Sequence, residues 1–117
     1  MLASVRIETM QGTPVARVNG EIDASNARLL GQRLTDSVPN TAMGLVVDLT
    51  ETSYLDSSGI QLLFELADRL RRRQQELHVV VPPESFVSDV LQAVNLSGAA
   101  KTDTSVLAAL EALASSG

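Results

Sequence analysis

The chain has 117 residues, of which 44% are hydrophobic, and a mean hydropathy of +0.12, so it is long enough to form one domain with its own core. Its net charge of −5 and pI near 4.7 argue against nucleic-acid binding, which needs a basic face. Because no apolar run reaches the length of a membrane span and residues 1–6 resemble a strand, not a signal peptide, we expect a single cytoplasmic domain over residues 1–117 that binds no membrane.

The first half of the chain predicts a hairpin, a helix and a buried strand. Residues 5–8 and 15–18 alternate apolar and polar side chains around a glycine- and proline-containing turn, which is typical of a β-hairpin. A first helix follows, with Asp23 as its expected N-cap and an apolar stripe that ends before Pro39. The next strand, at about 43–50, is apolar on both faces and is therefore expected at the centre of the sheet.

The chain then continues with a long helix, a strand and a short helix. The long helix is predicted over about 57–75 and the strand over 77–81, where two prolines end it. Pro83 suits the first turn of the short helix. Asn95 is expected in the left-handed conformation that closes this helix, since Asn tolerates that position second only to Gly.

The C-terminal part predicts a weak strand near 99–102 and a last helix that Asp103 or Thr104 caps. The residues expected to face inward from this helix are Val106, Leu107, Leu110 and Leu113. After the initial hairpin, strands and helices alternate, which indicates parallel strands joined by right-handed crossovers. The predicted fold class is therefore α/β.

The most informative motif is Asp56-Ser57-Ser58-Gly59, at the start of the long helix. Free backbone N–H groups and the helix dipole favour a hydrogen-bond acceptor or an anion there. From the residues alone, a serine at this place can be a plain cap, a nucleophile or a phosphate acceptor. A phosphate would add about −1.5 to −2 charges beside Asp56, and beside Asp23 if the two loops meet, so repulsion could switch binding off.

The residues do not support an enzyme. The single histidine, His78, is flanked by apolar residues in a predicted interior strand, which favours a structural role over that of a catalytic base. The serine motif lacks the first glycine of a Gly-x-Ser-x-Gly nucleophile elbow. With no cysteine, one histidine and no glycine-rich phosphate loop, we expect no catalytic residue, no metal site and no cofactor. The arginines at 69 and 71–73 are interpreted as a solvated helix end.

In this order and at these spacings, the motifs resemble those of a known family. The segments at 20–23, 47–49, 54–60, 77–82 and 90–96 resemble the single-domain STAS proteins that act as bacterial anti-sigma factor antagonists. The resemblance covers essentially the whole chain. It implies a STAS-like fold with a mixed four- to five-stranded sheet and about four helices, mainly on one face.

The resemblance also implies a function in transcription regulation. Ser57, directly after the aspartate, would be the phosphorylated residue, with Ser58 as the second choice. The partner would be an anti-sigma factor that is itself a serine kinase, and a metal-dependent serine phosphatase would reverse the modification. Only the unmodified antagonist would bind the anti-sigma factor and so free the sigma factor. The implied partner-binding residues are Asp23, Asp56, Ser57, Ser58 and Gly59.

Two other roles stay open. A STAS module can be a non-switching scaffold, as a subunit of a transport ATPase or of a stress-sensing complex, although the intact Ser57 motif weighs against this. A hydrolase with Ser57 as nucleophile would need a base that the sequence does not show. Two departures from the family pattern lie outside the motif: Asn95 replaces a glycine of many relatives, and residues 97–100 are poor in β-branched side chains, so the last strand is expected to be short.

Overall fold

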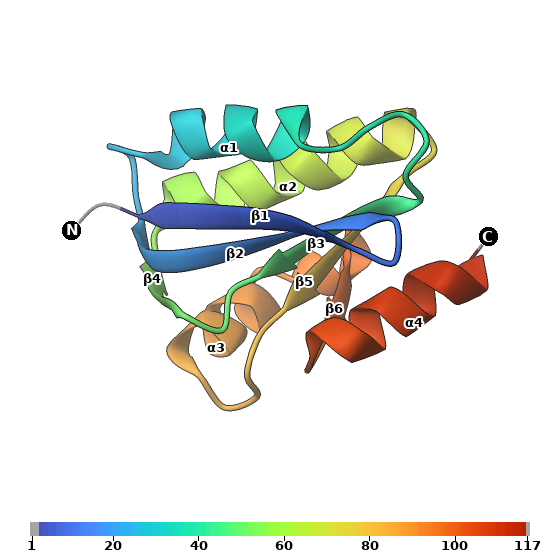
Figure 1. Cartoon of the computed structure of the whole chain (residues 1–117). Helices are drawn as coiled ribbons and strands as arrows, with labels where there is room; N and C mark the ends of the chain where they lie inside the picture. Colours follow the sequence, from blue (N-terminus) through green and yellow to red (C-terminus); the bar gives the residue numbers. More distant parts are fainter. Residues whose placement is uncertain (1–2, 117) are drawn as a thin grey trace.

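The structure is a computed structural model that describes residues 3–116 as a mixed sheet with helices on both faces (Figure 1). The strands are β1 (Ser4–Met10), β2 (Thr13–Ile22), β3 (Gly44–Asp48), β4 (Thr52–Leu55), β5 (Glu76–Val80) and β6 (Lys101–Asp103). Their order is β1-β2-β3-β5-β6, and β4 pairs with β2 outside this path. Only the β1–β2 pair is antiparallel, as the predicted hairpin requires, and the other pairs are parallel.

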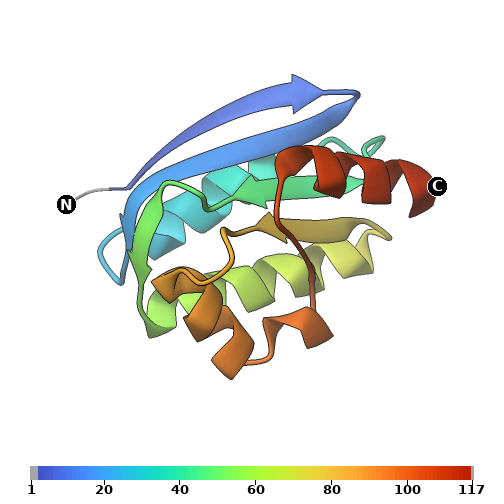
Figure 2. The ribbon, with the colours of Figure 1, turned by 90° about the horizontal axis from the view of Figure 1, so that it is seen from below.

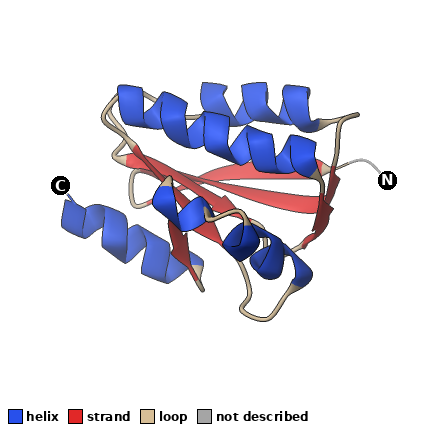
Figure 3. Cartoon of the chain, turned by 180° about the vertical axis from the view of Figure 1, so that it is seen from behind, coloured by secondary structure: helices blue, strands red, loops and turns tan. Residues whose placement is uncertain are grey.

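The helices are α1 (Ala27–Asp36), α2 (Ser57–Arg72), α3 (Phe86–Ala93) and α4 (Val106–Ser116), with a 3₁₀ turn η1 (Leu96–Gly98) after α3. Buried residues of α1, α2, α3 and η1 share one hydrophobic cluster with one face of the sheet. A smaller cluster joins α4 to the opposite face (Figures 2 and 3). The expectation of an α/β fold with helices mainly on one face is confirmed. Within the described residues, no helix is long and apolar enough to span a bilayer.

The central strand β3 is buried along its whole length, as its continuous apolar sequence predicted. Leu45 and Val47 pack into the cluster formed with α1 and α2, whereas Val46 points to the cluster under α4. Alternate residues of a strand face opposite sides of a sheet, so a strand covered on both sides is apolar at nearly every position. This is why Leu45, Val46 and Val47 form an apolar run, whereas the buried Asp48 at the end of β3 is paired with Arg17 at 2.8 Å.

The sheet has six strands, one more than the resemblance implies, and the additional strand that the sequence does not predict is β4. β4 is only four residues long, and only Thr52 and Leu55 in it are buried, so it has no clear alternation. It pairs in parallel with the end of β2, with Ile22 opposite Leu55. Tertiary pairing, not local propensity, therefore defines this strand.

Two predicted helix starts are wrong by a few residues. Asp23 is not the N-cap of α1, because the helix begins after Asn26. Pro83 is not in the first turn of α3: Glu84 next to it has a positive φ of 64°, which interrupts any helix there. Ser85 caps α3 instead, and its hydroxyl accepts a hydrogen bond from the Ser88 N–H at 3.1 Å.

The last helix differs from its prediction in a similar way. Neither Asp103 nor Thr104 caps α4; the Ser105 hydroxyl accepts a hydrogen bond from the backbone N–H of Ala108 at 3.1 Å. Leu107, expected to face inward, is 60% exposed. The buried positions of α4 in the described cluster are Ala109, Leu110 and Leu113. β6 is short, as its composition predicted, and Asn95 has the expected left-handed conformation, with φ 56° and ψ 48°.

The arginines at the end of α2 fit the interpretation of a solvated helix end only in part. Arg71 and Arg72 pair with Asp68 at 2.7 and 2.9 Å on the exposed surface, where such pairs contribute little. Arg73 lies just beyond the helix and donates a hydrogen bond to the carbonyl oxygen of Val38 at 2.9 Å. Arg73 thus ties the end of α2 to the loop that follows α1.

Candidate functional site

The pairing of β2 with β4 brings the two predicted acidic loops together. The backbone N–H of Asp56 donates a hydrogen bond to the carbonyl oxygen of Ile22 at 3.2 Å. Asp23 follows Ile22, and Asp56 follows Leu55, the residue paired with Ile22. Because parallel strands end at the same edge of a sheet, the Asp23 loop and the start of α2 lie side by side there. The two loops do meet in space.

Asp56 is the N-cap of α2. Its carboxylate accepts hydrogen bonds from the backbone N–H groups of Ser58 at 2.8 Å and Gly59 at 3.3 Å. Its own carbonyl oxygen accepts the first hydrogen bond of the helix, from Ile60. The residue of the motif that caps the helix is therefore Asp56. Ser57 is exposed, and its hydroxyl has no hydrogen-bond partner in residues 3–116, so it is not needed to hold the helix end.

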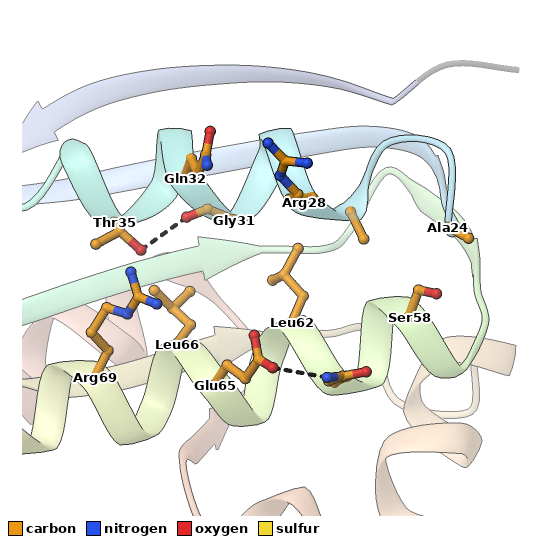
Figure 4. Close-up of a pocket in the computed structure, with 12 residues that line it drawn as sticks. Ala24, Arg28, Gly31, Gln32, Thr35, Ser58, Leu62, Glu65, Leu66 and Arg69 are labelled. Atoms are coloured by element: carbon orange, nitrogen blue, oxygen red, sulfur yellow. Dashed lines mark hydrogen bonds between the residues drawn. The ribbon is translucent and has the colours of Figure 1, made fainter.

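Ser58 and Gly59 are placed differently from Ser57. Ser58 is half-buried and lines a groove between α1 and α2, where it lies near Ala24 of the Asp23 loop (Figure 4). Gly59 is buried, and a Cβ on it would lie 2.9 Å from the Cβ of Leu55 and 3.2 Å from Cγ2 of Ile22. Gly59 thus lets the first turn of α2 approach the two strands that carry the acidic loops. The lack of a Cβ on Gly59 therefore determines where Ser57 lies, and Gly59 itself offers no side chain to a partner.

The Asp23 loop is closed by its own polar groups. The carboxylate of Asp23 accepts hydrogen bonds from the hydroxyl and, at 2.9 Å, from the backbone N–H of Ser25. Asn26 completes the turn: its Oδ1 accepts from the Asp23 N–H at 3.1 Å, and its Nδ2 donates to the carbonyl oxygen of Glu21 at 2.9 Å. The hydrogen bonds from the Ser25 hydroxyl and N–H lower the pKa of Asp23, so its negative charge persists to lower pH.

The effect of Ser25 on Asp23 can be measured. We expect Ser25→Ala to raise the pKa of Asp23 toward its ordinary value, because the hydroxyl bond is lost while the backbone bond stays. A carboxylate whose pKa is lowered on folding stabilises the folded state above its unfolded-state pKa, and this stabilisation is lost as the pH falls through the folded-state pKa. Because Ser25→Ala raises the folded-state pKa of Asp23, the variant should lose this stabilisation at a higher pH than wild type. Carboxylate titration by NMR checks this, with Ser97→Ala as a control. An unchanged titration of Asp23 would contradict it.

The cap can be separated from the charge of Asp56. We expect Asp56→Ala to lower the free energy of unfolding by about 1 kcal/mol, since two N–H groups lose their acceptor. Asp56→Asn keeps an acceptor oxygen at the cap without the charge and should retain most of that stability. Urea unfolding measures both variants. Equal losses for Ala and Asn would mean that the charge, not the cap, stabilises the helix.

The single histidine of the chain is paired elsewhere in the structure. His78 is 1% exposed in β5, and its two ring nitrogens lie 2.9 Å from the Asp103 carboxylate and 3.1 Å from the Glu76 carboxylate. The histidine therefore links β5 to β6, as the interpretation of an interior histidine predicted, and neither nitrogen contacts Ser57. Among residues 3–116, no group of three or more His, Cys, Asp or Glu side chains could hold a metal ion.

Sequence reasoning missed an aromatic pair beside the site. The rings of Tyr54 in β4 and Phe86 in α3 stack with centroids 5.8 Å apart and planes inclined by 10°. They are 41% and 54% exposed. The two residues are far apart in the sequence, so only the packing of α3 on β4 reveals the pair.

The site is thus an exposed serine at the start of a helix that an aspartate caps. The family model for the STAS domain matches residues 4–109, and the chain belongs to this family. The chain is 40% identical over 89 residues to the anti-sigma-B factor antagonist of Listeria monocytogenes, a match that covers 69% of this chain and 78% of that protein. The protein of the same name from Listeria innocua matches equally well.

Solved structures have the same fold. An anti-sigma factor antagonist from Mycobacterium paratuberculosis superposes with a TM-score of 0.84 at 24% identity, covering 96% of this chain and 94% of that one. A putative antagonist from Thermotoga maritima gives 0.83 at 19% identity, with 93% of each chain covered. The phosphorylated form of the Bacillus cell fate determinant SpoIIAA gives 0.64 at 18% identity, covering 93% of this chain and 99% of that one.

Proposed function

We propose that this protein is an anti-sigma factor antagonist switched by phosphorylation of Ser57. The unmodified form binds an anti-sigma factor that is a serine kinase, and this binding frees the sigma factor. The kinase transfers a phosphoryl group from ATP to the Ser57 hydroxyl and then releases the antagonist. A metal-dependent serine phosphatase hydrolyses the phosphoserine and restores binding. In this cycle the protein is a substrate of its partners.

The placement of Ser57 is the observation that carries the proposal. Ser57 is exposed and has a free hydroxyl because Asp56 supplies the cap of α2. A kinase can therefore reach the oxygen without unwinding the helix. Ser58 is the second choice, but it is half-buried at the groove between α1 and α2, so a phosphate there would need more room (Figure 4).

The charges around Ser57 explain how the modification would act. A phosphate brings about −1.5 to −2 charges at neutral pH. The N-terminus of α2 attracts an anion, but Asp56 lies directly beside it and the Asp23 loop next to it, and both side chains are acidic. Once a partner covers this surface, the phosphate and both carboxylates would have to share a site from which water is excluded. Repulsion and desolvation together then oppose binding.

The related proteins support the partner class. The curated relatives are named for antagonism of an anti-sigma factor, and one of the structural neighbours is a phosphorylated form. The partner surface that we propose contains Asp23, Asp56, Ser57 and Ser58. Gly59 belongs to it indirectly, because it sets the position of the helix start.

The direct test is phosphorylation in vitro. The protein is incubated with ATP and, in turn, with each purified anti-sigma factor kinase of its own organism, and the peptide of residues 54–69 is examined by mass spectrometry. We expect one phosphate, on Ser57, and none in Ser57→Ala. Phosphate on Ser58 would move the site by one residue. If no kinase modifies the peptide, the switch is wrong and a fixed scaffold role becomes the better explanation.

A further inference from the structure

Tyr54 and Phe86 form an exposed aromatic pair beside the Ser57 site. The two rings stack on each other, yet both stay well exposed, at 41% and 54%. Tyr54 lies two residues before Asp56, and alternate residues along an extended chain point to the same side. Phe86 is the first residue of α3, which packs against β4 (Figures 1 and 2). The pair therefore extends the surface that begins at Asp56.

The surroundings of the pair are acidic. Glu84 and Asp89 are exposed on either side of Phe86, one before α3 and one in its first turn. Residues 34–68 and 79–100, which include β4, the start of α2 and α3, contain no lysine or arginine at all. Aromatic rings with carboxylates around them suit a cation, because the face of a ring attracts positive charge and the carboxylates can pair with it.

We propose that the Tyr54–Phe86 pair is a second contact surface for the anti-sigma factor kinase, and that it receives a basic side chain, best an arginine, set among apolar residues. This inference rests on the proposed function and adds a contact to it. Two copies of the pair and its surroundings would repel each other, since residues 34–68 and 79–100 carry carboxylates and no lysine or arginine, which argues against a homodimer here. The exposed Glu84 and Asp89 also argue against an anionic membrane or a nucleic acid as the partner of this surface.

In this proposal the aromatic pair contributes affinity, and the phosphorylation state of Ser57 switches binding on or off. Buried aromatic residues at the centre of an interface commonly carry much of its affinity. The pair can therefore supply affinity that does not depend on the state of Ser57, while the phosphate decides whether the neighbouring surfaces can close. The affinity of the unmodified form should then depend on both residues, and also on salt, because a cation is involved.

The chain offers a specific reporter for this surface. Tyr54 is its only tyrosine, and it has no tryptophan. Protein labelled with fluorotyrosine thus gives one fluorine NMR signal, which reports on the pair alone. In the Ser57→Ala background, where no phosphorylation can occur, we expect the signal to shift on addition of the anti-sigma factor kinase that binds the protein. We expect Tyr54→Ala and Phe86→Ala each to weaken binding about tenfold and Tyr54→Phe to bind nearly as wild type.

The controls are two leucines that are at least as exposed but lie elsewhere, Leu29 on α1 and Leu107 on α4, which are 68% and 60% exposed. Leu29→Ala and Leu107→Ala should bind like wild type, and circular dichroism confirms that each variant is folded. If the Ser57 switch works but the fluorine signal and the affinities of the aromatic variants do not change, this inference is wrong and the proposed function stands. If no kinase binds wild type, both fail. A shift that depends only on protein concentration would assign the pair to self-association instead.

Discussion

Ser57→Asp is expected to weaken binding to the anti-sigma factor kinase by about 30-fold to 4,000-fold. Placing an uncompensated charge in a closed interface costs about 2–5 kcal/mol, and each 1.4 kcal/mol is a factor of ten. Ser57→Ala removes only the hydroxyl, which has no hydrogen-bond partner in residues 3–116. In the presence of ATP, Ser57→Ala should therefore stay bound while wild type is released.

Isothermal titration calorimetry with the purified kinase measures both variants, with and without ATP. Ser97→Asp is the matched control: it adds the same charge at an exposed serine in η1, next to Asn95 and away from the Asp23 loop. It should bind like wild type. Ser57→Asp that binds as tightly as Ser97→Asp would show that local charge at the helix start does not operate a switch.

Ser58→Asp distinguishes the two serines of the motif. Ser58 is half-buried and faces the groove beside α1, so a carboxylate there would also disturb packing between the loop and α2. We expect this variant to lose both stability and binding, whereas Ser57→Asp should lose binding alone. Urea unfolding next to calorimetry separates these effects. The opposite pattern would make Ser58 the regulatory residue.

The sequence predicts most of the architecture because its signals are local. The apolar run of residues 45–47 in β3 indicates a central strand, and the alternation around the first turn indicates the hairpin. The apolar residues around His78 indicate a structural histidine in the core or on the sheet surface, and its side chain is 1% exposed. The motif at 56–59 also marks the start of α2 correctly, because an aspartate cap acts on N–H groups only two and three residues away.

What the sequence does not predict depends on partners that are distant along the chain. β4 exists because the end of β2 pairs with it, and the Tyr54–Phe86 pair exists because α3 packs on β4. Asp23 looks like a helix cap, but the turn with Ser25 uses its carboxylate and the helix starts later. Cap residues are common in loops, so composition alone cannot choose among neighbouring candidates.

Gly59→Ala is expected to lower the free energy of unfolding by about 1 kcal/mol, although alanine is the better helix former. The added Cβ would lie 2.9 Å from the Cβ of Leu55, an atom next to the β4 backbone that cannot rotate away. Overpacking of this kind costs about 1–3 kcal/mol. The gain of about 1 kcal/mol from helix propensity offsets only part of it, because α2 must move away from β2 and β4.

Gly31→Ala in α1 is the matched control, because it makes the same chemical change in a helix that has room for it. Its Cβ would meet the side chain of Leu62 at 3.5 Å, an ordinary contact, so we expect a gain in stability of up to about 1 kcal/mol. The two variants should therefore differ by about 1–2 kcal/mol in urea unfolding, with opposite signs. If both were stabilised, close packing at Gly59 would not fix the helix start. Ser57 would then owe its position to the Asp56 cap alone.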